Sequence, residues 1–307
     1  MEKSAELFRW SFSKISKMLE SPVEYKKKYI LGEKEDGAKY FEEGELIHYL
    51  LLKGSNIGDK YVVLSSKAPS DKLKAVIQLL IDNDLDINND ESLLMALKVK
   101  DLYQTYKVET QLANARKEGK EYFDNMKASV GKTVVDIDTM ARCMTKVEII
   151  KENKKVMDLI GSCDNGQMPV NEIDLFGEVC GEPVHGIIDN LVTHNGVVII
   201  NDFKTTSKSI QQFRESYDKY FYDIQAALYM ELVKQNVKIE GNTEDVRFRF
   251  NFIVFDKYNN LYVFPVSEET LAKAKQHLED ALKECVWHFE NDDYTLPVSY
   301  ALGQVIL

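Results

Sequence analysis

Three short runs rich in Val, Ile and Phe, separated by tight turns, constrain the fold of this chain more than any other feature. The runs cover residues 171–180, 183–193 and 197–203. The gaps between them hold Gly181-Glu182 and His194-Asn195-Gly196, and gaps with Gly and Asn favour hairpin turns. Because hairpins join antiparallel strands, the segment predicts a three-stranded antiparallel sheet.

Helical patterns surround this predicted sheet. Before it, apolar residues recur at helical spacing in residues 11–19, 23–30, 41–52, 73–81, 93–115 and 138–160, the last as one helix or two. After it, we expect a helix at 217–235, strands at 246–255 and 261–266, and a final helix at 267–289. This order predicts a mixed α/β or α+β fold with a central sheet flanked by helices. We expect one domain over residues 1–307, mostly helical in 1–160 and sheet-containing in 161–307.

The composition is that of a soluble globular protein, since 44% of the 307 residues are hydrophobic and 29% are charged. With 39 basic and 50 acidic residues the formal net charge is −11, which excludes a uniformly basic surface for polyanions. A local basic groove, or a site where metal ions supply positive charge, remains compatible. No segment reaches the roughly 20 apolar residues of a membrane span, and Glu2 and Glu6 interrupt the N-terminus. We therefore expect a cytoplasmic protein without membrane association.

Two carboxylates and a lysine on neighbouring strands form the pattern that points to chemistry. Asp189 stands near the end of the second run, after Gly186, Asp202 stands near the end of the third, and Lys204 directly follows the third run. Side chains two residues apart in a strand lie on the same face, so Asp202 and Lys204 share one. Carboxylates that converge at the ends of paired strands suit Mg²⁺ or Mn²⁺. A lysine beside the metal can orient or deprotonate an attacking water.

Asp-x-Lys alone is common on protein surfaces, so its neighbours matter. Here a Gly-x-x-Asp strand precedes it, which is a rarer arrangement. On the helix expected at 217–235, Gln225 and Tyr229 lie four residues apart on one face. Burial of Gln225 on this apolar helix would be costly without a hydrogen-bond partner, whereas a tyrosine at this spacing is often a core residue.

These residues together resemble a known family. Asp189, Asp202-Phe203-Lys204 and Gln225-x-x-x-Tyr229 resemble the PD-(D/E)xK nuclease signature in its RecB-like form. The likeness is closest to the RecE-like exonucleases (exodeoxyribonuclease VIII) and their phage relatives. It also extends over residues 10–29, 44–48, 131–160 and Glu172, and it is weakest between 55 and 125. The resemblance implies a restriction-endonuclease-like core in residues 161–307.

The resemblance implies a role for each matching residue. Asp189 and Asp202 would be metal ligands, the Phe203 backbone carbonyl would complete the shell, and Lys204 would act on the hydrolytic water. Gln225 and Tyr229 would organise the site and contact DNA phosphate.

Two further metal ligands are implied outside the central motif. His48 matches the helical histidine of the family, with an ordinary surface histidine as the alternative. Glu172 matches the carboxylate of the preceding strand, and Asp174 on the same strand face is an alternative for that position. Mg²⁺ is the expected metal, and Mn²⁺ is expected to replace it.

Several RecB-like nucleases hold an iron–sulfur cluster, but we expect none in this chain. Such a cluster needs four thiolates, and the N-terminal cysteine of those relatives is replaced by Ser21. The four cysteines, Cys143, Cys163, Cys180 and Cys285, are scattered and form no Cys-x-x-Cys pair. Reduced thiols are therefore expected, without a zinc knuckle or a disulfide framework.

The resemblance implies an exonuclease that degrades duplex DNA ends in phage-type recombination. Its implied properties are 5′→3′ polarity, assembly as a homo-oligomer and a single-strand annealing protein as partner. Lys208, Arg214 and Lys219 could line a groove for DNA phosphates, and residues 70–127 could form a DNA clamp or a subunit interface. Two alternatives remain: an endonuclease or single-strand nuclease of another RecB-like branch, and a non-catalytic DNA-binding or replication accessory protein.

Overall fold

The computed structural model describes residues 8–33, 43–53, 56–64, 68–128, 132–161, 163, 168–194, 196–237 and 246–305. Among the positions used in the sequence predictions, Glu2, Glu6, Phe41, Gly131 and Asn195 lie outside the described residues. The chain divides into two compact units. Unit 1 comprises residues 1–34 and 149–307, and unit 2 comprises residues 35–148.

Unit 1 is built on a five-stranded mixed sheet. Its strands, in spatial order, are β3 (Val170–Val179), β4 (Glu182–His194), β5 (Val197–Thr205), β6 (Arg247–Phe255) and β7 (Leu261–Val266). The first three form an antiparallel meander, β6 pairs in parallel with β5, and β7 pairs antiparallel with β6. A parallel pair requires a crossover connection, which contains η5 (Ile210–Gln212), α9 (Phe213–Lys219) and α10 (Tyr222–Asn236).

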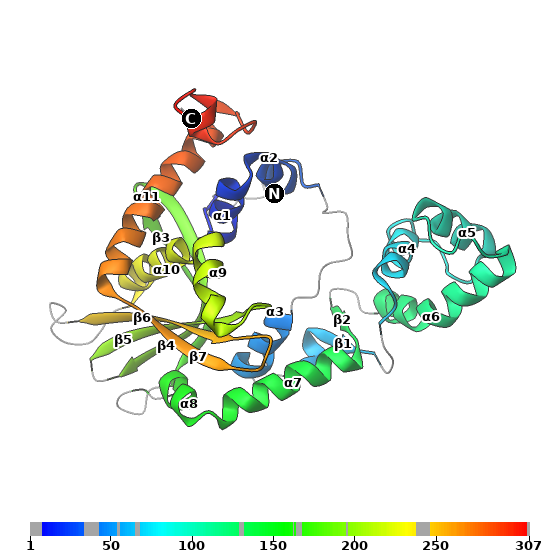
Figure 1. Cartoon of the computed structure of the whole chain (residues 1–307), viewed down its shortest axis with the longest axis horizontal. Helices are drawn as coiled ribbons and strands as arrows, with labels where there is room; N and C mark the ends of the chain where they lie inside the picture. The colour runs from blue at the N-terminus through cyan, green and yellow to red at the C-terminus, as the bar shows by residue number, and fades with distance from the viewer. Residues whose placement is uncertain are drawn as a thin grey trace, which may run out of the picture. The chain divides into compact units, whose positions relative to one another are not determined.

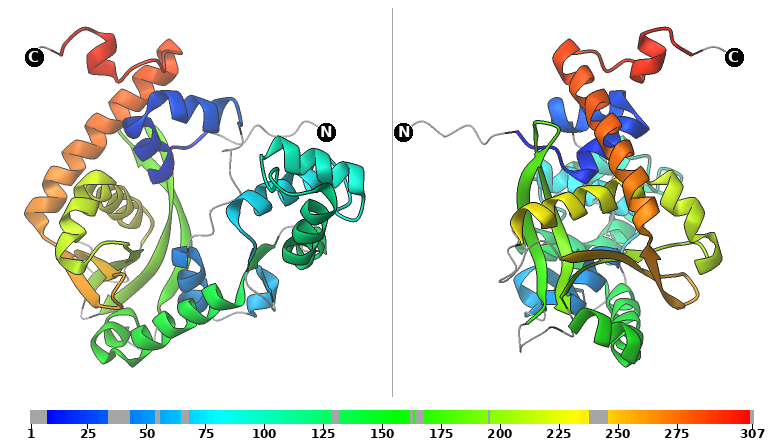
Figure 2. Two further views of the ribbon diagram at one scale, coloured as in Figure 1. Left: turned by 45° about the vertical axis from the view of Figure 1, so that its right-hand side comes forward. Right: turned by 90° about the vertical axis from the view of Figure 1, so that its left-hand side faces the viewer.

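Three helices of unit 1 stack on one face of the sheet (Figure 1). α10 packs on β3, β4 and β6, α11 (Glu268–Asn291) packs on α10, and α1 (Phe12–Glu20) packs on both helices. Figure 2 shows α11 running past α10 on the same side of the sheet. Apolar side chains from these elements form the main core, which includes Trp10, Ile188, Leu228, Phe252 and Leu278. Burial of this apolar surface is the main force that holds the layers together.

A shorter helix covers part of the opposite face. α8 (Lys154–Gly161) contacts β4, and its Leu159 packs on a small cluster formed by Val192, Val197 and Ile199. β4 and β5 are therefore buried on both faces along part of their length.

The N-terminal segment of unit 1 is tied to the edge of this layer. The backbone N–H of Trp10 donates to the Pro183 carbonyl at 2.8 Å, and the His185 N–H donates to the Trp10 carbonyl at 2.9 Å. Ser21 then caps α2 (Pro22–Tyr25) by accepting from the Glu24 N–H. A π-helical turn, η1 (Lys26–Ile30), follows, and α12 (Val298–Ala301) lies near the C-terminus.

Unit 2 is mostly helical and has its own core. Its elements are α3 (Glu43–His48), η2 (Tyr49–Lys53), η3 (Ile57–Asp59), β1 (Tyr61–Val63), α4 (Asp71–Asp82), α5 (Asp90–Val99), α6 (Val108–Ala128), β2 (Thr133–Val135) and the first part of α7 (Ile137–Glu152). β1 and β2 form a parallel pair, and Leu73, Ile77, Leu97 and Phe123 contribute to the core of α4–α6.

The predicted fold class is confirmed, with a central sheet flanked by helices. Two predicted helices are wrong in extent. The helix expected at 93–115 is two helices, α5 and α6, because Asp101 and Tyr103 between them adopt left-handed φ values of 48° and 62°. The helix expected at 217–235 is likewise α9 and α10, separated at Phe221 with φ 56°. The description of the chain as one domain remains a prediction.

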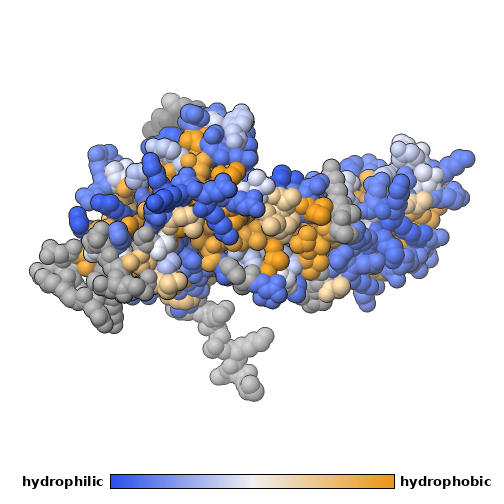
Figure 3. Space-filling view, turned by 90° about the horizontal axis from the view of Figure 1, so that it is seen from below, coloured by the Kyte–Doolittle hydropathy of each residue, from blue (hydrophilic) through white to orange (hydrophobic). Residues whose placement is uncertain are grey.

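The surface of the α4–α6 region is mainly hydrophilic where Figure 3 displays it, at the right of that view. This agrees with the many charged residues in that part of the sequence. Among the described residues, none of the helices combines the length and apolar character that crossing a membrane requires.

Candidate functional site

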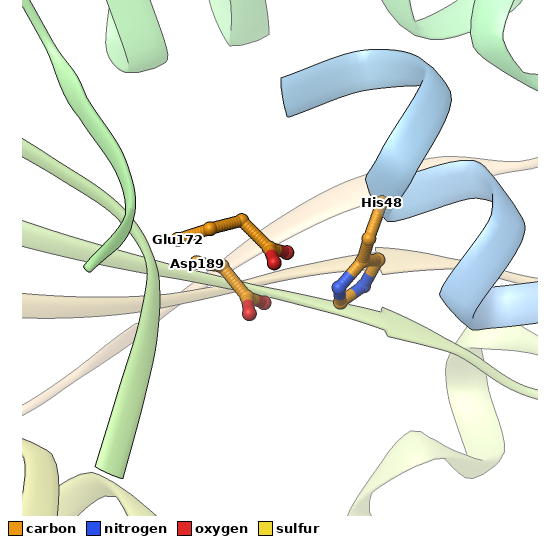
Figure 4. Close-up of side chains that lie close together, drawn as sticks. All are labelled: His48, Glu172 and Asp189. Atoms are coloured by element: carbon orange, nitrogen blue, oxygen red, sulfur yellow. The ribbon is translucent and has the colours of Figure 1, made fainter. Parts of the chain in front are cut away.

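Two carboxylates from neighbouring strands lie close together in unit 1. Glu172 belongs to β3 and Asp189 to β4. Each offers a carboxylate oxygen, and these two oxygens lie within 4.8 Å of one another. Figure 4 shows both groups directed to the same side of their strands. Two carboxylates this close repel each other when both are charged, and a cation between them would remove that repulsion.

The backbone of Glu172 explains how its side chain reaches this position. Its φ is 52°, in the left-handed region, which is uncommon for a residue other than glycine and is concentrated at functional sites. The ladder pairs Asn171 with Asn190 and Ile173 with Ile188 on either side, so the distortion is confined to Glu172. Asp174, the sequence alternative, lies instead 3.6 Å from His185 Nδ1.

Asp189 lies within β4, whereas the motif suggested a strand end. Its Oδ2 accepts a hydrogen bond of 2.8 Å from the backbone N–H of Phe203 on β5. Burial raises the pKa of Asp189 to about 6, and the charge of Glu172 adds to this effect, while Lys204 and the Phe203 N–H oppose it. A nearby cation would therefore stabilise this carboxylate in its charged form.

Asp202 and Lys204 form a buried ion pair on β5. The Lys204 Nζ lies 2.5 Å from Asp202 Oδ2, with side-chain exposures of 15% and 1%. Burial disfavours the charged form of Lys204, but the attraction of Asp202 is strong enough to raise its pKa above the ordinary value. Lys204 is therefore a cation at neutral pH. The shared strand face that the sequence predicted for these two residues accounts for their contact.

Gln225 and Tyr229 of α10 reach the same region from the helix layer. The Gln225 Nε2 donates to Asp202 Oδ1 at 3.0 Å, which gives the buried amide nitrogen a partner. Burial raises the pKa of Tyr229, and the charges of Asp202 and Asp189 add to the effect. Tyr229 also explains the glycine of the Gly-x-x-Asp motif, because a Cβ on Gly186 would lie 2.7 Å from its ring.

The aromatic residues around Lys204 were not identified from the sequence. The Lys204 Nζ lies 4.9 Å from the centre of the Tyr222 ring and 5.9 Å from that of Phe252. Such contacts stabilise a cation and restrict the lysine side chain. Tyr222 is the first residue of α10 and Phe252 lies in a β6 run rich in phenylalanine, so neither position has a signal that separates it from an ordinary core residue.

The three candidate DNA-contact residues lie on or just before α9. Lys208 pairs with Glu215 at 2.7 Å, and Arg214 pairs with Asp218 at 3.1 Å. The Lys219 Nζ lies 5.3 Å from the centre of the Tyr220 ring. Two of these cations are thus paired with carboxylates of the same segment.

His48, also drawn in Figure 4, is the last residue of α3 in unit 2. Within unit 2, Glu43 ties α3 to α7 through Arg142 at 2.8 Å and Lys146 at 2.9 Å. Burial disfavours the charge on Glu43, but the hydrogen bonds from Lys146 and Arg142 lower its pKa. The helix that carries the imidazole is therefore firmly held in its own unit, and the role of His48 as a ligand remains a prediction.

The donors of unit 1 fit a divalent cation that prefers oxygen. Glu172 and Asp189 supply close carboxylate oxygens, which suit Mg²⁺ or Mn²⁺ better than the thiolates that soft metals select. Asp202 lies on the neighbouring strand but is engaged by Lys204 and Gln225 in this conformation. A metal that used Asp202 would have to share its carboxylate with these partners.

Comparisons with known proteins identify the family of the chain. A family model described as the PD-(D/E)XK nuclease superfamily matches residues 9–294. Among solved structures, a crystal structure of a protein from Eubacterium rectale, described provisionally as an exonuclease, is 14% identical. The alignment covers 100% of this chain and 95% of that chain with a TM-score of 0.48, which is too weak to support an inference about activity. No curated protein sequence matches the chain.

Proposed function

Because the chain belongs to the PD-(D/E)XK nuclease superfamily, we propose that it is a Mg²⁺-dependent exonuclease that hydrolyses phosphodiester bonds at the ends of duplex DNA. One observation carries the proposal. The Glu172–Asp189 carboxylate pair lies on β3 and β4, and β4 adjoins β5, which carries the buried Asp202–Lys204 ion pair. Acidic metal ligands beside a buried cation are the groups that hydrolysis of an anionic phosphodiester requires.

We assign the metal-binding role to Glu172, Asp189 and Asp202, with Mg²⁺ as the ion and Mn²⁺ as an effective substitute. A bound divalent ion would lower the pKa of a coordinated water and neutralise charge that develops on the phosphate. The Phe203 N–H orients the Asp189 carboxylate, and the Phe203 carbonyl is proposed as an additional oxygen ligand. His48 is proposed as a further ligand, since imidazole nitrogen is compatible with transition metals such as Mn²⁺.

Lys204 acts as a cation in this proposal. Its raised pKa favours orientation of the attacking water and stabilisation of phosphate charge over removal of a proton. Gln225 holds Asp202 in place through its 3.0 Å hydrogen bond. Tyr229, which packs on Gly186, is proposed to contact a DNA phosphate.

Recognition of DNA is proposed to depend on its backbone. Lys208, Arg214 and Lys219 would exchange their present contacts with carboxylates and an aromatic ring for phosphate oxygens. Affinity should then fall steeply with salt, because phosphate binding releases counterions. The RecE-like resemblance supports 5′→3′ polarity, a homo-oligomer, a single-strand annealing partner and a role in phage-type recombination.

A cleavage assay on labelled DNA tests the proposal. Linear duplex labelled at the 5′ or the 3′ end is incubated with the protein in Mg²⁺, in Mn²⁺ or in EDTA, beside a covalently closed circle of the same sequence. We expect early release of the 5′ label, slow loss of the 3′ label, survival of the circle and no reaction in EDTA. Early release of the 3′ label would reverse the proposed polarity.

Two other outcomes would assign different functions. Nicking of the closed circle at the rate of linear degradation would identify an endonuclease. Binding of DNA without cleavage in either metal would identify a non-catalytic accessory protein. Glu215→Gln provides a matched control in the same assay, because it frees Lys208 from its ion pair without changing a carboxylate of the site.

A further inference from the structure

Four asparagines on four adjacent strands form a continuous hydrogen-bonded row, here called the asparagine ladder. Its members are Asn171 of β3, Asn190 of β4, Asn201 of β5 and Asn251 of β6. They are direct neighbours in the strand register: Asn171 with Asn190, Asn190 with Asn201, and Asn201 with Asn251. Asparagine is depleted in strands, so four in register require a reason.

The hydrogen bonds of the ladder all run in one direction. The Nδ2 of Asn251 donates to Asn201 Oδ1 at 2.9 Å, that of Asn201 to Asn190 Oδ1 at 2.8 Å, and that of Asn190 to Asn171 Oδ1 at 2.8 Å. Asn190, Asn201 and Asn251 are 1%, 0% and 7% exposed. Aligned hydrogen bonds in a buried row strengthen one another.

The ladder also holds a helix. The second Nδ2 hydrogen of Asn190 goes to the Ile160 carbonyl at 2.9 Å, and Asn201 makes a longer contact of 3.5 Å with the Leu159 carbonyl. Both carbonyls lie in the last turn of α8, where the helix itself supplies no donor. The ladder thus connects α8 to the face of β4 and β5 on which it packs.

Each of the first three asparagines is the sequence neighbour of a proposed metal ligand. Asn171 precedes Glu172, Asn190 follows Asp189, and Asn201 precedes Asp202. Each of these asparagines is therefore one peptide bond away from a carboxylate residue, so a shift of the row along a strand moves the carboxylate with it. A hydrogen bond between two asparagines therefore fixes the relative position of the two carboxylates beside them.

Hydrophobic burial alone does not specify this register. Residues 197–203 of β5 are buried at every position, so a shifted β5 would still bury apolar side chains on both faces. A one-residue shift would nevertheless move Asp202 to the opposite face. A shifted ladder leaves buried amides unpaired, which disfavours it by roughly 5- to 150-fold per group.

We propose that the asparagine ladder is a positioning device of the active site, which locks β3, β4 and β5 in the one register that brings Glu172, Asp189 and Asp202 together. The inference rests on the proposed function of that site. The asparagines contact neither metal nor DNA and act only through the strands that carry the carboxylates.

Asn201→Leu tests the ladder, because leucine has the same branching and number of side-chain heavy atoms but removes the two ladder hydrogen bonds that Asn201 makes. The matched control is Ile199→Ala, which weakens the contact between β5 and α8 on the same sheet face and leaves every ladder bond intact. Calorimetric titration with Mn²⁺ should show about 10- to 100-fold weaker binding for Asn201→Leu, as for other residues that support metal ligands. Ile199→Ala should bind Mn²⁺ as the wild type does.

Hydrogen exchange provides a readout that needs neither metal nor activity. The amide protons that join β4 and β5 should exchange at least tenfold faster in Asn201→Leu than in Ile199→Ala, and cross-strand NOEs should reveal a second register. Wild-type Mn²⁺ affinity together with slow exchange in Asn201→Leu would overturn the inference. If Asn201→Leu fails to fold, Asn251→Leu removes only the terminal donor and should give a smaller change in the same direction.

These measurements also distinguish a failure of the ladder inference from a failure of the proposed function. A wild-type protein that neither binds Mn²⁺ nor cleaves DNA refutes the proposed function, and the exchange data then decide whether the ladder sets the register. A wild-type protein that binds and cleaves, with Asn201→Leu unchanged in all three readouts, refutes the ladder alone.

Discussion

Replacement of Asp189 by asparagine should stabilise the metal-free protein at neutral pH. Burial, with a contribution from Glu172, raises the pKa of Asp189 from 3.8 to about 6. Each pKa unit corresponds to about 1.4 kcal/mol, so the charged carboxylate destabilises the folded state by about 3 kcal/mol above pH 6. Asparagine cannot ionise, and its Oδ1 can still accept the hydrogen bond from the Phe203 N–H.

The sign of the pH dependence follows from proton binding. Between about pH 4 and pH 6 the folded protein keeps a proton on Asp189 that the unfolded chain has lost. The stability contributed by this group is therefore complete below pH 4 and is lost as the pH rises through 6. Wild type and Asp189→Asn should be equally stable near pH 4 and should diverge to a difference of up to about 3 kcal/mol at pH 7.

Urea unfolding in EDTA at pH 4 to 8 measures this difference. Both tryptophans, Trp10 and Trp287, belong to unit 1, so their fluorescence follows the unit that contains Asp189. Asp174→Asn is the matched control, since it removes a carboxylate whose side chain is 51% exposed on the adjacent strand. If Asp189→Asn is no more stable than wild type at pH 7, the carboxylate is not held in an unfavourable environment and the reasoning is refuted.

Three further predictions concern the other residues of the site. Asp202→Asn should destabilise the protein by roughly 3 kcal/mol in urea unfolding, because it leaves Lys204 buried without its partner; an unchanged midpoint would contradict the buried ion pair. Gly186→Ala should cost about 1–3 kcal/mol in the same assay, because its Cβ overlaps the Tyr229 ring, whereas the control Gly161→Ala meets nothing within 4 Å and should be tolerated. Lys204→Ala should reduce single-turnover cleavage by about 10²–10³-fold and keep Mn²⁺ binding, and loss of that binding would mean that Lys204 maintains the site rather than assisting the reaction.

The strands of unit 1 were the most predictable part of the fold. Apolar runs bounded by Gly- and Asn-containing turns locate β3, β4 and β5 closely, and the spacing of Asp202 and Lys204 gives their common face. β1 and β2 were missed because three residues show no periodicity. The break at Phe221 was missed because a left-handed phenylalanine has no sequence signal, unlike a glycine.

The site itself was predictable by residue type but less so by arrangement. Asp189 and Asp202 are recognisable from their strands, but the engagement of Asp202 by Lys204 and Gln225 depends on packing between α10 and β5. The left-handed backbone of Glu172, which distinguishes this residue from the alternative Asp174, has no signal in the sequence either. The asparagine ladder does have a signal in the sequence, since each of four predicted strands contains an asparagine, a residue that is disfavoured in strands.

Single-turnover cleavage of end-labelled linear duplex by wild type and Asp189→Asn in Mg²⁺ is the most direct test of a metal-dependent nuclease centre. Asp189→Asn is suited to it because, without metal, the variant should be at least as stable as the wild type, so lost activity cannot be attributed to unfolding. We predict Mg²⁺-dependent cleavage by the wild type and a loss of roughly 10²–10⁴-fold in the variant, as expected when metal stabilisation of the transition state is removed. Cleavage by Asp189→Asn at the wild-type rate would contradict the assignment of this site.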